Sequence, residues 1–113
     1  MPDGRMTFHL APRARWEGWA SNAPYESPSL GVEGFIHCTD GVDSMVATAN
    51  RFYRDDPAEF VVLTVDLDAC RSPWRIDDPG KPFPHIYGPI QREAILGVRP
   101  FPRDAEGAFL SFE

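Results

Sequence analysis

Residues 59–67 read Glu-Phe-Val-Val-Leu-Thr-Val-Asp-Leu and form a strongly strand-like, almost continuously apolar segment. Valine, phenylalanine and threonine fit the pleated surface of a sheet. A strand that is apolar on both faces has to be covered on both faces, so we expect this one at the centre of its sheet. The segment therefore predicts that a β-sheet organises the chain.

Shorter strand-like segments lie on both sides of this central strand. We expect strands at residues 6–10 and 34–39 before it and at residues 83–89 and 94–99 after it, with a weaker one at 74–76. Twelve prolines and nine glycines among 113 residues cut the chain into short pieces. That composition favours many short strands and tight turns over a bundle of helices.

Two helices are expected in the N-terminal half of the chain. A short one begins at Pro12, because proline suits the first turn of a helix. The longer one has apolar residues at steps of three and four, and Thr39 or Asp40 is expected as its N-cap. Its apolar face consists of Val42, Met45, Val46, Ala49, Phe52 and Tyr53. Residues 21–33 are expected to form a flexible connecting segment.

These elements predict one α+β domain over residues 1–113, with a C-terminal tail (103–113) that packs onto the body through its phenylalanines. Seventeen acidic and eleven basic residues give a net charge of −6, which argues against a broad nucleic-acid-binding surface. No apolar run approaches the roughly 20 residues that span a bilayer, and no signal core is evident. We therefore expect a cytoplasmic protein without a membrane partner, whose two cysteines stay as thiols.

The candidate chemistry lies in three histidines, each within a predicted strand: His9, His37 and His85. Alternation along a strand places Tyr87 on the same face as His85, and Thr39 on the same face as His37. Thr39 also stands where the longer helix begins, and a helix N-terminus favours anions. The alternative interpretation is purely structural: three partly buried imidazoles, bonded to nearby backbone, that do not converge on one cavity.

Three segments resemble a known family. Gly-Phe-Ile-His-Cys-Thr (34–39), Ala-Asn-Arg-Phe-Tyr (49–53) and Phe-Pro-His-Ile-Tyr-Gly-Pro (83–89) are similar to the bacterial family called domain of unknown function 952. The resemblance extends from about residue 7 to about residue 102, and the last segment is the most specific. The family has no assigned biochemical role. Its fold is related to the ADP-ribosyltransferases, which implies a split β-sheet with two short helices.

The resemblance also implies roles for these residues. His9 corresponds to the first-strand residue that bonds a ribose hydroxyl of NAD, and residues 34–39 are similar to the histidine-bearing strand of RNA 2′-phosphotransferases. In that interpretation His37 and Thr39 position ribose or phosphate, Tyr87 stacks on the base, and His85 is the acid or base. His85 stands where many transferases have glutamate, and a histidine provides no permanent negative charge for a developing cation.

Two functions stay open at this point. One is a cleft for NAD, as a substrate, or for a related nucleotide, with transfer of ADP-ribose or a phosphate-linked group. The other is a non-catalytic nucleotide-binding or regulatory domain on the same fold. A zinc ion on the three imidazoles is disfavoured, because their spacing is not a known ligand spacing and no glutamate is expected near them. Cys38 is expected in the core, and the acidic pair Asp77-Asp78 in a solvent-facing turn.

Overall fold

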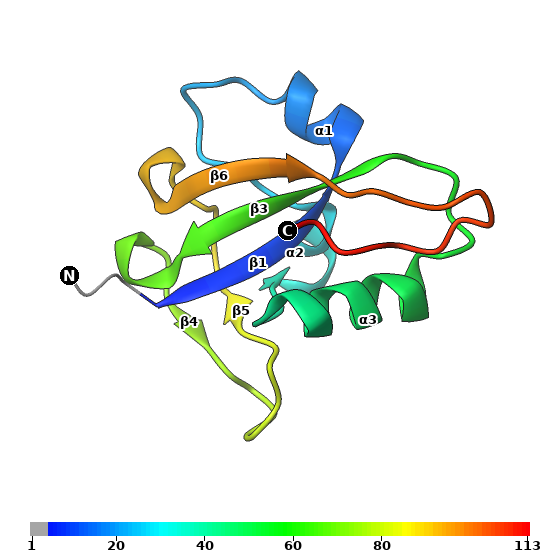
Figure 1. Cartoon of the computed structure of the whole chain (residues 1–113). Coiled ribbons are helices and arrows are strands. Elements are labelled where there is room, and N and C mark those ends of the chain that lie inside the picture. The colour runs from blue at the N-terminus through cyan, green and yellow to red at the C-terminus, as the bar shows by residue number, and fades with distance from the viewer. Residues whose placement is uncertain (1–4) are drawn as a thin grey trace.

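The structure is a computed structural model, and it describes residues 5–113. It is built of short strands and short helices (Figure 1). In chain order they are β1 (Met6–Pro12), α1 (Arg13–Gly18), α2 (Pro28–Glu33), β2 (Ile36–His37), α3 (Val42–Phe52), β3 (Phe60–Asp66), the 3₁₀ turn η1 (Leu67–Ala69), β4 (Trp74–Arg75), β5 (His85–Ile86), the 3₁₀ turn η2 (Arg92–Ala94) and β6 (Ile95–Pro100).

The larger sheet has the order β1-β3-β6, and all of its pairs are antiparallel. β3 lies in the middle, as the sequence predicts, and Figure 1 shows β1 and β6 along its two sides. The β1–β3 register runs from Met6 opposite Asp66 to Pro12 opposite Phe60. Residues 60–63 are at most 5% exposed, so the continuous apolar run is buried on both faces.

The two faces of β3 contact two separate hydrophobic clusters. Val61, Leu63 and Val65 belong to one, which also holds residues of β1, β2 and β5. Phe60 and Val62 belong to the other, which is closed by α3 and by three phenylalanines of the C-terminal part: Phe101, Phe109 and Phe112. The predicted docking of the tail is therefore confirmed.

The smaller sheet has the order β2-β5-β4 and is also antiparallel. A single bridge joins the two sheets, in which Phe8 and Thr39 exchange backbone hydrogen bonds of 3.0 and 2.8 Å. The chain is thus a small α+β domain with a split sheet.

The strands of the smaller sheet are shorter than the predicted ranges 34–39 and 83–89. β2 and β5 hold two residues each, and beyond them Cys38 and Asp40 donate to the carbonyls of Pro84 and Pro82. Proline has no N–H to give in return. The pairing therefore continues in one direction only, and the regular ladder ends.

Within residues 5–113 the structure has three α-helices, one more than predicted. Residues 21–33, expected as a flexible connection, contain α2. Pro28 occupies its first turn, and Gly34 follows it in the left-handed conformation with φ of 86°. These are the ordinary start and stop signals of a helix, but the six residues between them are too few to show an apolar period.

The predicted N-cap of α3 is wrong. Gly41, with φ of 86°, occupies that position, and no side chain caps the helix. Thr39 is held by the bridge to Phe8, and the Asp40 carboxylate accepts hydrogen bonds of 3.0 and 2.6 Å from the Arg5 guanidinium. Both residues are occupied by contacts with the N-terminal segment, so neither reaches the first turn of the helix.

Candidate functional site

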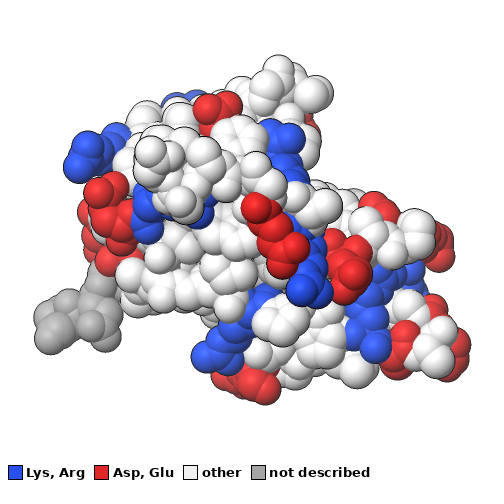
Figure 2. Space-filling view, turned by 90° about the horizontal axis from the view of Figure 1, so that it is seen from above, with Lys and Arg blue, Asp and Glu red and all other residues white. Residues whose placement is uncertain are grey.

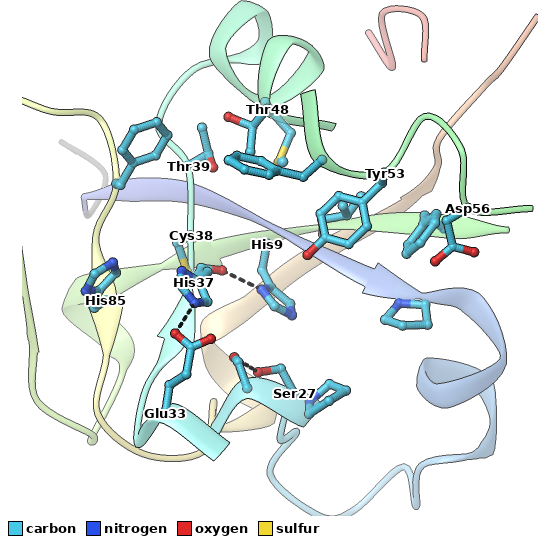
Figure 3. Close-up of a pocket in the computed structure, with 18 of the residues that line it drawn as sticks. His9, Ser27, Glu33, His37, Cys38, Thr39, Thr48, Tyr53, Asp56 and His85 are labelled. Atoms are coloured by element: carbon cyan, nitrogen blue, oxygen red, sulfur yellow. Dashed lines mark hydrogen bonds and ion pairs between the residues drawn. The ribbon is translucent and has the colours of Figure 1, made fainter. Parts of the chain in front are cut away.

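A cavity of about 860 Å³ lies between α2 and α3, over the edge where the two sheets meet (Figure 3). β1, α2 and β2 supply one part of its lining, and α3 from Met45 onward, with residues 53–60, supplies another. Residues 78–85 complete it. A volume of several hundred Å³ is typical of sites for small organic ligands.

His9 projects from β1 into the middle of this lining (Figure 3). It is 4% exposed, and its Nδ1 donates to the backbone carbonyl of His37 at 2.7 Å. Because a carbonyl can only accept, this bond fixes the tautomer and leaves a lone pair on Nε2. Nε2 is buried and has no protein partner. Burial, the largest cause, lowers the pKa of His9 to about 4, so the ring is neutral near pH 7.

His37 stands at the mouth of the cavity, where its side chain is 52% exposed. Its Nε2 donates to the Glu33 carboxylate at 2.9 Å, and both residues line the cavity (Figure 3). The predicted absence of a glutamate near the histidines is therefore wrong for His37. Gly34 reverses the chain after α2 with its positive φ, and this brings the end of the helix back beside β2.

His85 lies on β5 next to His37, with ring centroids 5.2 Å apart, and its ring stacks on Phe35 at 4.1 Å. Its Nδ1 donates to the Asp77 carboxylate at 2.8 Å, which leaves a lone pair on Nε2. Asp77 also accepts a hydrogen bond from the Tyr87 hydroxyl. The hydrogen bonds from Tyr87 first, and from His85 second, lower the pKa of Asp77. Asp77 is exposed, as expected for a solvent-facing turn, but its carboxylate is also held by these two side chains.

Four of the five predicted site residues line one cavity: His9, His37, Thr39 and His85. The purely structural interpretation, in which the three histidines do not converge, is contradicted. Tyr87 is not brought to this cavity. It faces a smaller hollow of about 280 Å³ beside Arg75, whose guanidinium lies 4.4 Å from the centre of the tyrosine ring.

Sequence reasoning missed one further polar group in the lining. Tyr53 follows α3 and was assigned to the apolar face of that helix. It lines the cavity, and in Figure 3 its hydroxyl points toward His9. The position of Tyr53 could have indicated this role. A tyrosine at the end of an apolar helix face can pack its ring against apolar neighbours and still present its hydroxyl to a polar site.

The helix N-terminus expected to bind an anion is not part of this lining. α3 contributes Met45, Thr48 and Phe52, from its middle and last turns, and none of its first three residues. The free N–H groups of its first turn therefore lie outside the cavity lining.

Neither cysteine fits the role of a nucleophile. Cys38 is buried in the core as expected, and burial strongly raises the pKa of its thiol. Burial is also the main cause that raises the pKa of Cys70 to about 11. Among residues 5–113, no three side chains of His, Cys, Asp or Glu are grouped closely enough to hold a metal ion.

The surface carries its charges in a mixed pattern. On the face seen in Figure 2, basic side chains stand next to acidic ones and do not form a continuous basic field. In the part of the chain that the structure describes, no helix has the length and apolarity needed to cross a membrane.

The family described as "Protein of unknown function (DUF952)" matches residues 10–98. The chain belongs to this family. The match contains two of the three histidines, His37 and His85, together with the segments from which the resemblance was drawn, and it begins directly after His9. The DUF952 description names no activity. No curated protein matches the chain.

Solved structures of one protein from Caulobacter crescentus, CC0527, share the fold of this DUF952 chain. Its crystal structure has a TM-score of 0.75 at 23% identity and covers 94% of each chain. The crystal structure of a double mutant of the same protein gives 0.74 at 23% identity over the same share of each chain. Its solution structure gives 0.68 at 24% identity and covers 90% of this chain and 89% of that one. At this identity the likeness concerns the fold alone.

Proposed function

We propose that the cavity binds NAD or a related nucleotide through a nucleoside portion. The observation that carries this proposal is the buried His9 Nε2, a hydrogen-bond acceptor without a partner, on a residue that lines a ligand-sized cavity. Leaving such a group unsatisfied costs free energy, and a ligand hydroxyl or N–H would remove that cost. The relation of the family's fold to the ADP-ribosyltransferases, expected from the sequence, supports the same ligand class.

The lining residues suggest which part of the ligand each of them would contact. A ribose hydroxyl would donate to His9, and His37 with Thr39 would hold the same sugar from the side of β2. Phe52 and Phe83 are exposed at the lining by 66% and 37% and offer faces on which a base can stack. This role replaces the one expected for Tyr87. No Lys or Arg of residues 5–113 lines the cavity, so the diphosphate would extend out of it.

A second candidate function is group transfer, and the Asp77–His85 hydrogen bond favours it. A carboxylate that holds Nδ1–H of a histidine orients the ring and leaves Nε2 as a general base. His85 would take the proton of an acceptor group during transfer of ADP-ribose, and Asp77 would position it. The non-catalytic alternative keeps the cavity and assigns this pair to structure alone.

Calorimetric and thermal-shift titrations of NAD and ADP-ribose would test the binding proposal, on wild type and on His37→Ala. A ligand at 100 times its Kd adds about 2.7 kcal/mol to the free energy of unfolding, which a thermal shift detects easily. Arg71→Ala serves as the control, because Arg71 is exposed and outside the lining. Binding that is weakened by His37→Ala and not by Arg71→Ala supports the assignment. No saturable binding of either ligand at millimolar concentration overturns it.

Release of nicotinamide from NAD, followed by chromatography, separates the two candidates. Transfer or hydrolysis that is lost in Asp77→Asn with NAD affinity retained supports the catalytic function. Saturable NAD binding with no nicotinamide release, over many hours and with a range of nucleophilic acceptors, supports the non-catalytic one.

A further inference from the structure

The charges that face the cavity have one sign. Glu33, Asp56 and Asp78 belong to its lining, and the lining within residues 5–113 holds no lysine or arginine. Arg103 contacts the loop that carries Asp56, but it does so through hydrogen bonds to backbone carbonyls, and it does not line the cavity. The permanent charge presented to a ligand is therefore negative.

The histidines do not reverse this sign. His37 and His85 each donate one ring N–H to a carboxylate, of Glu33 and Asp77 respectively, so both rings already stand beside a negative charge of the protein. The third ring, His9, is neutral in its buried position and offers a lone pair. Its Nε2 can therefore accept a hydrogen bond from a ligand donor, and it offers no positive charge to an anion.

The walls between these polar groups are aromatic. Phe52, Tyr53 and Phe83 are all more than a third exposed and line the cavity. The Arg51 guanidinium lies 5.2 Å from the centre of the Phe52 ring and already covers one face of it, so the rings of Tyr53 and Phe83 are the ones that carry the argument. A ring face is attractive to a cation, and best so where water is partly excluded. Aromatic walls, acidic side chains and a buried acceptor are the combination with which proteins hold organic cations.

From these observations we propose that the cavity selects an organic cation, a ligand whose positively charged nitrogen is carried on an apolar or aromatic body and which also bears a hydrogen-bond donor. This inference rests on the proposed function and narrows it. Within an NAD-type ligand it assigns the cavity to the pyridinium nucleoside and not to the adenosine, because only the pyridinium ring carries a positive charge that the acidic lining would attract.

A charge series built on one ring tests the inference directly. The probes are 1-methylnicotinamide, which is cationic, nicotinamide, which is neutral, and nicotinate, which is anionic. Calorimetry should show 1-methylnicotinamide binding about tenfold more tightly than nicotinamide, and nicotinate more weakly still. Added salt should reduce the difference in affinity between 1-methylnicotinamide and nicotinamide, because salt screens the charge of exposed carboxylates. Equal affinity for the cationic and the neutral probe, or tighter binding of nicotinate, overturns the inference while the ligand-binding function stands.

Two variants test whether the carboxylates of the cavity lining cause the preference for the cationic probe. Asp78→Asn should lower the affinity for 1-methylnicotinamide by about threefold, and Asp56→Asn/Asp78→Asn by about tenfold, with nicotinamide unaffected. Glu93→Gln removes the same charge at a salt bridge to Arg71, outside the lining, and should change neither. An equal effect of Glu93→Gln would mean that net charge, and not the cavity, sets the preference.

Benzylamine and benzyl alcohol form a second pair that separates the two proposals. Benzylamine binding, with benzyl alcohol failing, supports cation selection, and it separates the two proposals where the titrations of NAD and ADP-ribose show no binding. Failure of every probe at millimolar concentration overturns cation selection, while the NAD-type function is decided by the titrations of NAD and ADP-ribose.

Discussion

Acidification should destabilise this protein through His9, and the effect can be calculated. The ring has an ordinary pKa of 6.5 in the unfolded chain and a pKa of about 4 in the fold. A base whose pKa is lowered by folding binds its proton more readily in the unfolded state. His9 therefore contributes stability that is fully present above its unfolded pKa and is lost as the pH falls toward 4.

The lowered pKa sets the size of this loss. From about pH 7.5 to about pH 5, protonation of the unfolded state removes about 2 kcal/mol of folding free energy, and by about pH 4 the loss reaches about 3 kcal/mol. For a domain whose total stability is on the order of 5–15 kcal/mol, this is a large fraction.

Urea unfolding of wild type and His9→Asn at these pH values measures the contribution. Asparagine does not titrate here, and its amide can still donate to the carbonyl of His37, which now accepts from Nδ1. Other groups titrate in both proteins, so the difference between the two pH dependences isolates His9. The reasoning is refuted if both proteins lose the same free energy between about pH 7.5 and about pH 5.

Two further predictions concern the smaller sheet and its flank. Gly88→Ala should lower the free energy of unfolding by about 1–3 kcal/mol, because the new Cβ would lie 2.5 Å from Oγ and 2.9 Å from Cβ of Ser72. Gly97→Ala, where nothing lies within 4 Å, is the control in thermal unfolding, and equal losses would contradict the steric explanation. The carboxyl pKa of Asp77 should lie below its ordinary 3.8, so the stability it contributes is fully present well above pH 3.8 and is lost as the pH falls from there through the lower value. Tyr87→Phe should raise this pKa in a ¹³C NMR titration, and an unchanged pKa would show that the hydroxyl is not its main partner.

The parts of the fold that depend on local pattern could be predicted from the sequence. The burial of β3 follows from an apolar run in which adjacent side chains point to opposite faces. The face of α3 follows from its period, with Met45 and Ala49 buried as expected. The short helix α2 could not be found by the same means, because its six residues span less than two turns and bury no side chain.

The candidate site shows why contacts between elements are harder to predict. That three histidines would gather was a reasonable hypothesis, since each lies on a strand near the junction of the sheets. Their carboxylate partners depend on how the chain turns between elements, as with Glu33 and His37, four residues apart across the reversal at Gly34. Tyr87 lies on the same side as His85, as strand alternation predicts, because both side chains donate to Asp77 and both rings lie near Phe35. It nevertheless faces the smaller hollow beside Arg75 and not the cavity, because alternation along a strand does not say where a cavity ends.

The strand order has a consequence for how the protein is made. β3 is flanked by strands from residues 6–12 and 95–100, and the second cluster is closed by Phe109 and Phe112. A growing chain on the ribosome therefore has no early portion with a complete sheet or a covered core. Until the last of these segments has left the exit tunnel, β3 has an unpaired edge and one uncovered apolar face, the kind of surface that chaperones recognise. Synthesis and folding are separated in time, and a message truncated before residue 95 yields a chain prone to aggregate.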